Sequence, residues 1–231
     1  MIEFKGAGVV APDGARILEP ITLTLAEQHV SVIGANGSGK STLARLINGL
    51  VVPTEGNVIV DGSDVVRDGK RARTLVGFLF TDPTAQLIMP TAIEDVELSL
   101  RQRLRRKSER TEAAVAALTE IGLAAKRDVS VHALSGGQKQ LLALAGVLAV
   151  EPSIIVADEP TTLLDLRWRA HVDALLAGLP QQLIEVTHDL EAAARADRCL
   201  VVDGGDIVFD GDPNAAVAHY RALMADEGRP Q

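Results

Sequence analysis

The chain has 231 residues, of which 47% are hydrophobic, so it can bury a core and global disorder is excluded. Its 23 basic and 31 acidic residues give a formal net charge of −8, which disfavours non-specific binding to the phosphate backbone of nucleic acids. The single cysteine, Cys199, excludes an internal disulfide, and no run reaches the about 20 apolar residues that a membrane-spanning helix needs.

Short apolar runs recur along the chain and alternate with helical patterns, which is typical of a parallel sheet covered by helices. The first residues lack a long apolar segment, so we expect no secretory signal. The runs predict strands at residues 21–25, 29–33, 57–60, 76–80, 154–157, 183–186, 199–202 and 207–209. Helices are predicted at residues 40–50, 166–176 and 190–196. We therefore expect an α/β fold, with a polar tail from Asp226 that frays.

The middle of the chain has a different pattern, with helices and no good strand from Thr91 to about residue 150. Thr91 and Glu94 form the spacing of a capping box at the start of one helix. A second helix has one apolar face and ends at Gly122, and a third covers residues 138–150. The pattern predicts a helical subdomain at residues 87–150, inserted into a core made of residues 1–86 and 151–231.

A glycine-rich loop stands between the strand predicted at 29–33 and the helix predicted at 40–50. It fills every fixed position of the P-loop pattern, and this context disfavours an ordinary turn. Glycines let backbone N–H groups wrap a triphosphate, and the helix start adds the positive end of its dipole. Lys40 is expected to reach the β- and γ-phosphates, and Ser41 to ligate Mg²⁺. The expected ATP-binding residues are Gly34, Asn36, Gly37, Ser38, Gly39, Lys40, Ser41 and Thr42.

The buried strand predicted at 154–157 is followed by two acids, Asp158 and Glu159. Taken alone, the pair is equally consistent with a solvated turn. Behind a P-loop, Asp158 suits Mg²⁺, directly or through water, and Glu159 suits a general base that polarises the attacking water.

The pentapeptide Leu134-Ser135-Gly136-Gly137-Gln138 lies between these two motifs. On its own it could be a helix N-terminus capped by Ser135. The order of P-loop, Ser-Gly-Gly-Gln and Asp-Glu resembles the ATP-binding cassette (ABC) ATPases over nearly the whole chain. The resemblance implies a P-loop NTPase core, with a parallel RecA-like part and an antiparallel β part, plus an inserted helical subdomain. It also implies ATP hydrolysis.

In that family the Leu-Ser-Gly-Gly-Gln pentapeptide is called the signature, and its residues bind ATP held by a second subunit. The resemblance therefore implies two ATPs sandwiched in a head-to-tail pair. Ser135, Gly136, Gly137 and Gln138 would contact the opposite ATP, and a homodimer is expected. Asp165 falls at the family's D-loop. His188 matches the switch histidine that contacts the γ-phosphate, although a histidine at a strand end can also serve a structural hydrogen bond.

Two family features are altered in this chain. The stretch before the P-loop that usually stacks an aromatic residue on adenine has none, and Val9 or Val10 could pack on the base instead. Thr81 stands where the family has its Q-loop glutamine, and a glutamine, Gln86, follows five residues later. We expect one of these two residues to serve as the Q-loop ligand.

The segment from Asp82 to Gln86, followed by Met89-Pro90-Thr91 and Glu94-Asp95-Val96, resembles the ATPases of energy-coupling-factor (ECF) importers. The short form of the chain favours the biotin-uptake type. The resemblance implies a transmembrane coupling protein and a substrate-binding membrane protein as partners, at the inner, cytoplasmic face of the cell membrane. No nucleic acid is expected. The alternatives are cobalt or nickel uptake, a conventional ABC transporter, a soluble ABC ATPase acting on nucleic acid, and a nucleotide switch without hydrolysis.

Five cations lie within seven residues between Arg101 and Lys107. The simpler interpretation is a solvated helix end, and the alternative is contact with anionic headgroups or an acidic partner. The cluster consists of Arg101, Arg103, Arg105, Arg106 and Lys107.

Overall fold

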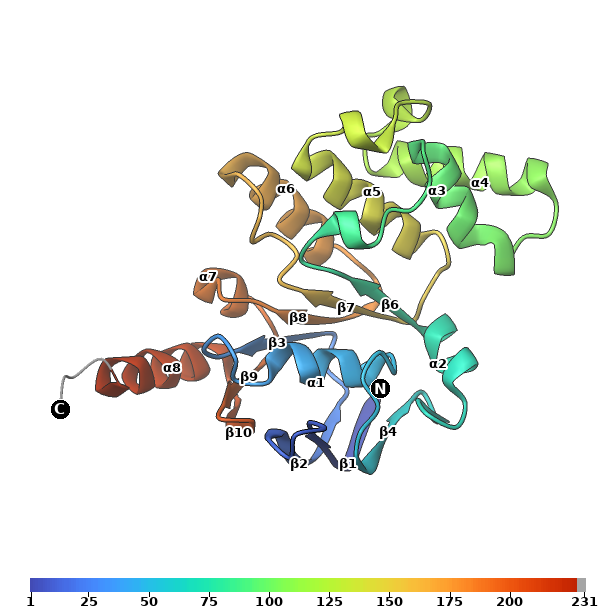
Figure 1. The fold of residues 1–231 in the computed structure, drawn as a ribbon. Helices are drawn as coiled ribbons and strands as arrows, with labels where there is room; N and C mark the ends of the chain where they lie inside the picture. Colours follow the sequence, from blue (N-terminus) through green and yellow to red (C-terminus); the bar gives the residue numbers. More distant parts are fainter. Residues whose placement is uncertain (228–231) are drawn as a thin grey trace. The chain divides into compact units, whose positions relative to one another are not determined.

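The computed structural model describes residues 1–227, and the tail expected to fray lies mostly outside them. The described chain forms two compact units. The first holds Met1–Val76, Ile154–Glu159 and the residues from Pro180 onward, and the second holds Gly77–Ser153 and Pro160–Leu179. Figure 1 traces the elements of each unit. The boundaries expected for a helical subdomain, at residues 87 and 150, remain a prediction.

An antiparallel sheet in the first unit has the strand order β2-β1-β4-β5. Phe4 of β1 lies opposite Leu23 of β2 and Val58 of β4, and it is 1% exposed. The pairing register of β1 with both neighbouring strands is irregular after Lys5, and this irregularity bends the strand. The strands are β1 (Ile2–Val10), β2 (Arg16–Leu25), β4 (Glu55–Val60) and β5 (Ser63–Asp64).

A mainly parallel sheet in the same unit includes the consecutive strands β10-β9-β3-β8-β7. β3 pairs in parallel with β8 and β9, and β7 pairs in parallel with β8. Because parallel strands end at one edge, the residues that follow β3, β7 and β8 meet there. The strands are β3 (His29–Ile33), β7 (Ile154–Asp158), β8 (Gln182–Val186), β9 (Arg198–Asp203) and β10 (Asp206–Gly211).

Helix α1 lies between the two sheets of the first unit and packs on strands of both (Figure 1). Its side chains Leu43, Leu46 and Ile47 are buried. The helices α7 and α8 pack on β3, β9 and β10. The helices of this unit are α1 (Lys40–Ile47), α2 (Gly69–Leu75), α7 (Leu190–Ala193) and α8 (Pro213–Glu227).

The second unit is mainly helical and contains most of β6 (Val76–Leu79). Its helix α5 buries Leu141, Leu142 and Leu144, the apolar run that the sequence shows. The predicted capping box is confirmed, because Glu94 accepts a hydrogen bond from Thr91 N at 3.2 Å. The helices are α3 (Ala92–Ser99), α4 (Lys107–Glu120), α5 (Gly136–Leu148) and α6 (Leu166–Ala177), with 3₁₀ turns at Pro83–Ala85, Leu100–Gln102, Ala124–Lys126 and Val131–Ala133.

The fold class is confirmed, and among the strands and α-helices of the described residues four were not predicted: β1, β5, α2 and α8. The helix predicted at 190–196 ends at Ala193. Within residues 1–227, no helix has both the length and the hydropathy needed to cross a bilayer.

The basic cluster runs from the 3₁₀ turn after α3 to Lys107, the first residue of α4, so its cations lie along the connection between these two helices. Arg103 donates to the carbonyl of Ala149, the C-cap of α5, at 3.0 Å and pairs with Glu151. Arg106 pairs with Glu109 in the first turn of α4. At least these two arginines therefore stabilise the helical unit, and the alternative interpretation, contact with anionic headgroups or an acidic partner, is untested.

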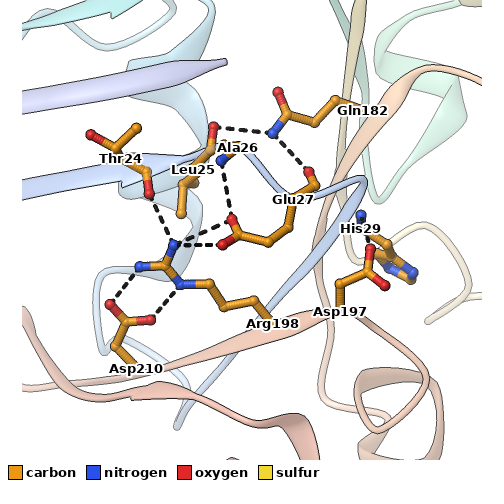
Figure 2. A network of polar contacts seen from close by, with 9 residues as sticks. All are labelled: Thr24, Leu25, Ala26, Glu27, His29, Gln182, Asp197, Arg198 and Asp210. Carbon is orange, nitrogen blue, oxygen red and sulfur yellow. Dashed lines mark hydrogen bonds and ion pairs between the residues drawn. The ribbon is translucent and has the colours of Figure 1, made fainter.

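A polar network holds the other edge of the parallel sheet, where β3, β8 and β9 begin (Figure 2). Arg198 forms two hydrogen bonds with Asp210, at 2.6 and 2.7 Å, and contacts Glu27 at 3.0 Å. Burial opposes ionisation of Glu27, but hydrogen bonds from its own N–H, from that of Ala26 and from Arg198 hold its pKa below the usual range. Gln182 adds bonds to the Leu25 and Glu27 carbonyls.

Candidate nucleotide-binding site

The glycine-rich loop joins β3 to α1 through backbone that only glycine tolerates at two positions. Gly34 has φ +152°, and a Cβ there would lie 2.0 Å from the carbonyl oxygen of Val202. Gly39, the N-cap of α1, has φ +106°. These glycines let the loop fold back tightly before the helix begins, as the P-loop pattern predicts.

A cavity of about 260 Å³ opens over the loop. The cavity suits a chain of phosphate groups, because the N-terminus of α1 attracts negative charge through its helix dipole and free N–H groups. The side chain of Ile17, from β2, forms an apolar wall and is 37% exposed. The cavity is lined by Ile17, Asn36, Gly37, Ser38, Gly39, Lys40, Ser41, Thr42 and Glu159.

Lys40 is 5% exposed, and its ammonium group lies against the loop. Its Nζ donates to the carbonyl oxygens of Gly34 at 2.8 Å and Ala35 at 2.7 Å. Burial lowers the pKa of Lys40, while the negative charges of Glu159 and Asp158 act in the opposite direction. The loop thus holds a buried cation beside its cavity, ready to pair with a phosphate oxygen.

Asp158 ends β7 and is 2% exposed. Its Oδ1 accepts a hydrogen bond from Ser41 Oγ at 2.9 Å, and its Oδ2 lies 3.3 Å from Arg45 Nη2. A hydroxyl and a carboxylate are oxygen donors of the kind that Mg²⁺ prefers. Among the described residues, no group of three His, Cys, Asp or Glu side chains could hold a metal alone. The pair therefore fits an ion that takes its other ligands from phosphate and water.

Glu159 follows Asp158 and has a left-handed backbone with φ +50°, which is rare for a residue with a side chain. Its N–H donates to the carbonyl of Val186 on the neighbouring β8 at 2.9 Å. Its Oε2 lies 3.5 Å from Nδ1 of His188, the second residue after β8. Such strain at a carboxylate beside an anion-binding loop is typical of catalytic sites.

The signature residues belong to the second unit, at the start of α5. Ser135 and Gln138 form a capping box, in which Ser135 N donates to Gln138 Oε1 at 3.0 Å and Gln138 N to Ser135 Oγ at 3.3 Å. Gly136 is exposed, and a Cβ there would have no atom of the described residues within 4 Å. Gly137 is buried, and a Cβ there would lie 2.2 Å from Trp168. The two glycines therefore face different surroundings.

Three further predicted site residues also lie in the second unit. Thr81 follows β6 and is half-buried. Gln86 ends the turn Pro83–Ala85, and its Oε1 is buried without a hydrogen-bond partner among the described residues. Asp165 caps α6 by accepting from Trp168 N at 3.0 Å. The choice between Thr81 and Gln86 as Q-loop ligand remains a prediction.

Two residues beside the site were not singled out in the sequence, Ile17 and Arg45. Val9, one of the two valines proposed to meet adenine, is 6% exposed in β1, whereas Ile17 lines the cavity. Arg45 could have been found from its spacing, because it lies four residues after Ser41 and so shares its face of α1. No sequence signal identifies Ile17, whose exposure depends on how β2 passes the loop.

Comparison with known proteins identifies the family of the chain. The family model described as ABC transporter matches residues 18–162. The chain is 45% identical to the biotin transport ATP-binding protein BioM of Rhizobium etli, over 97% of this chain and 99% of that protein. It is 39% identical to the energy-coupling factor transporter ATP-binding protein EcfA1 of Halalkalibacterium halodurans, over 87% of this chain and 74% of that protein.

Solved structures show the same fold. The structure of cbiO1 from Clostridium perfringens, part of the ABC transporter complex cbiONQ, has a TM-score of 0.84 at 27% identity, covering 99% of this chain and 94% of that one. The ATP-binding cassette MJ0796, in a dimeric post-hydrolysis state with ADP and Pi, has a TM-score of 0.83 at 31% identity, covering 92% and 99%. The chain therefore belongs to the ABC transporter family, as an ATP-binding subunit that hydrolyses ATP.

Proposed function

We propose that the chain energises uptake of biotin, or a related vitamin, by an ECF-type importer, through Mg²⁺-dependent hydrolysis of ATP. The observation that carries the substrate class is the 45% identity to BioM across 99% of that protein. The observation that supports the chemistry is the convergence of Lys40, Asp158, Glu159 and His188 at the P-loop.

The phosphate chain of ATP would lie along the loop, where Gly34, Asn36, Gly37, Ser38, Gly39 and Thr42 shape the cradle. Lys40 would pair with the β- and γ-phosphate oxygens, and Ile17 would pack against the nucleoside. Ser41 and Asp158 would hold Mg²⁺, which supplies charge neutralisation for the leaving and transferring phosphate oxygens.

Hydrolysis requires a water whose oxygen bonds to the γ-phosphorus as the bond to the ADP oxygen breaks. Glu159 would accept the proton of that water, and His188 would orient Glu159 and contact the γ-phosphate. The 3.5 Å separation of Glu159 Oε2 and His188 Nδ1 supports this pairing. The products are ADP and inorganic phosphate.

A second copy of the chain would complete each site. Ser135, Gly136, Gly137 and Gln138 would contact the ATP bound to the opposite subunit, and Asp165 would lie across the interface. Beside Asp165, Leu163 is 64% and Leu166 82% exposed, which suits an apolar surface that a partner covers. MJ0796 is a dimeric cassette, which supports a pair here.

Membrane partners would contact the segment from Asp82 to Met89, at the inner face of the membrane. Asp82 Oδ1 accepts from Thr84 N at 2.9 Å, and Asp95 Oδ1 accepts from Ile88 N at 2.8 Å and Met89 N at 2.9 Å. These bonds hold both ends of the segment, and Ile88 is 75% exposed between them. A fixed, exposed apolar side chain suits contact with a transmembrane coupling protein.

Purification of the tagged chain from gently solubilised native membranes tests this proposal. We expect two unlike small membrane proteins by mass spectrometry, with biotin retained by one of them. Retained cobalt or nickel would reassign the substrate, and a single large permease would indicate a conventional ABC transporter. Recovery with nucleic-acid machinery alone would contradict the transport assignment.

A further inference from the structure

The two oxygens of the Asp158 carboxylate have different partners on one helix. Oδ1 accepts from Ser41 Oγ at 2.9 Å, and Oδ2 lies 3.3 Å from Arg45 Nη2. Ser41 and Arg45 are four residues apart on α1, so both side chains leave the same face of that helix. The carboxylate is therefore held at both oxygens, and rotation about its Cβ–Cγ bond would break both contacts.

Arg45 also places a positive charge beside the carboxylate of Asp158, which is almost completely buried. The Asp158 side chain is 2% exposed, whereas that of Arg45 is 44% exposed. A carboxylate removed from water needs hydrogen bonds or a counter-charge. Lys40 Nζ donates its hydrogen bonds to the carbonyls of Gly34 and Ala35, whereas Arg45 Nη2 contacts Oδ2 of Asp158 directly.

We propose that Arg45 is a positioning residue for ATP hydrolysis, which holds Asp158 Oδ2 so that Oδ1 stays directed at Ser41 and at Mg²⁺. This inference rests on the proposed metal role of Asp158. Outer-shell partners of a ligating carboxylate fix its orientation, and their loss weakens metal binding without removing a ligand. A lysine would keep the charge but would lack the planar, forked donors of the guanidinium.

The test is an equilibrium titration of the full chain with Mn²⁺ in the presence of a non-hydrolysable ATP analogue, followed by electron paramagnetic resonance. We expect Arg45→Ala to raise the half-saturating Mn²⁺ concentration by about tenfold, the lower end of outer-shell effects. Arg45→Lys should give an intermediate value. Asp158→Asn should raise it further than either.

A matched control removes an arginine from the structural network of Figure 2. Arg198→Ala breaks contacts with Glu27 and Asp210 at the far edge of the sheet, so it should lower the melting temperature and leave Mn²⁺ binding unchanged. Equal shifts in Mn²⁺ binding for Arg45→Ala and Arg198→Ala would mean that Arg45 acts only on stability, and would overturn the proposal.

A double-mutant cycle without metal adds a second measurement. Arg45→Ala should lower the melting temperature in the wild-type background and change it little in Asp158→Asn, because the charge that Arg45 compensates is then gone. If Asp158→Asn weakens Mn²⁺ binding but Arg45→Ala does not, the positioning role is wrong and the proposed site stands. If Asp158→Asn leaves Mn²⁺ binding unchanged, the metal role of Asp158 is wrong and the positioning role falls with it.

Discussion

Glu159 Oε2 lies 3.5 Å from Nδ1 of His188, although 29 positions separate the two residues in sequence. The contact exists because β7 and β8 pair in parallel, so their ends meet at the edge that carries the P-loop. The N–H of Glu159 also donates to Val186, the last residue of β8. Backbone and side chain of Glu159 are thus both held against the segment that carries His188.

Glu159→Gln should slow ATP hydrolysis by at least about 100-fold, because an amide cannot accept the proton of the attacking water. The substitution keeps the size of the side chain and its capacity to contact His188. ATP binding and ATP-dependent pairing of subunits should persist, so the variant should form dimers that turn over slowly. Phosphate release and size-exclusion chromatography with ATP measure the two effects, and near-normal turnover would exclude Glu159 as the base.

Gly136 and Gly137 give a matched pair of alanine substitutions in the signature. Gly137→Ala places a methyl group 2.2 Å from Trp168 and should destabilise the chain by about 1–3 kcal/mol. The methyl group of Gly136→Ala would meet no atom of residues 1–227 within 4 Å, so this variant should leave the free energy of unfolding almost unchanged or slightly raised. Urea unfolding distinguishes them, and equal destabilisation would contradict the packing of Trp168 on Gly137.

The rate of ATP hydrolysis gives a second test of Gly136→Ala. Gly136 is exposed at the α5 N-terminus, where the proposed second subunit presents its ATP. Gly136→Ala should therefore reduce ATP hydrolysis without loss of stability. Wild-type turnover in that variant would count against contact between Gly136 and the opposite ATP.

The site could be predicted where one chemical requirement fixes both residue type and spacing. The P-loop needs glycine where the backbone approaches Val202, and Asp158 and Glu159 must follow a buried strand to reach the sheet edge. Arg45 and Ile17 satisfy no such local requirement. Their contribution arises only when α1 packs on β7 and when β2 passes the loop.

Dependence on tertiary packing also explains why some elements were not predicted from the sequence. β1 carries Lys5, Gly6 and Gly8 among its apolar residues, and irregular pairing interrupts its alternation. The strand forms because Phe4 and Ile2 are buried between β2 and β4, which is a tertiary effect. Long-range pairing of this kind overrides local propensity and leaves little trace in the periodicity.

Acid should remove the stabilisation that comes from Glu27. Its pKa is below 4.5, the ordinary value, in the folded chain, so its ionised form stabilises the fold above about pH 4.5. As the pH falls through the lowered pKa, Glu27 takes up a proton and this contribution is lost. The difference in unfolding free energy between wild type and Glu27→Gln should therefore shrink below about pH 4.5.

Urea unfolding at several pH values from 7 to 3 measures this difference. Glu112→Gln, at an exposed position on α4 outside the Arg198 network, is the control for removal of a carboxylate. A difference for Glu27→Gln that stays constant with pH would contradict the role of the Arg198 network in holding Glu27 ionised.

Asp95 fixes the segment proposed to meet the membrane partner, since its Oδ1 accepts from the N–H groups of Ile88 and Met89 at 2.8 and 2.9 Å. Asp95→Ala leaves both donors without this acceptor and should lower the free energy of unfolding by about 1–3 kcal/mol.

The amides of Ile88 and Met89 should exchange hydrogen with solvent faster in Asp95→Ala, while the exchange of amides in the middle of α4 should not change. Asp95→Asn keeps an acceptor oxygen, so the exchange rates of these amides should lie between those of the wild type and those of Asp95→Ala. Hydrogen exchange followed by mass spectrometry provides the comparison, and unchanged exchange at Ile88 and Met89 would show that the segment is held by other contacts. If the exchange rises as expected, recovery of membrane proteins with Asp95→Ala should fall, because a mobile Ile88 must lose more conformational entropy on binding.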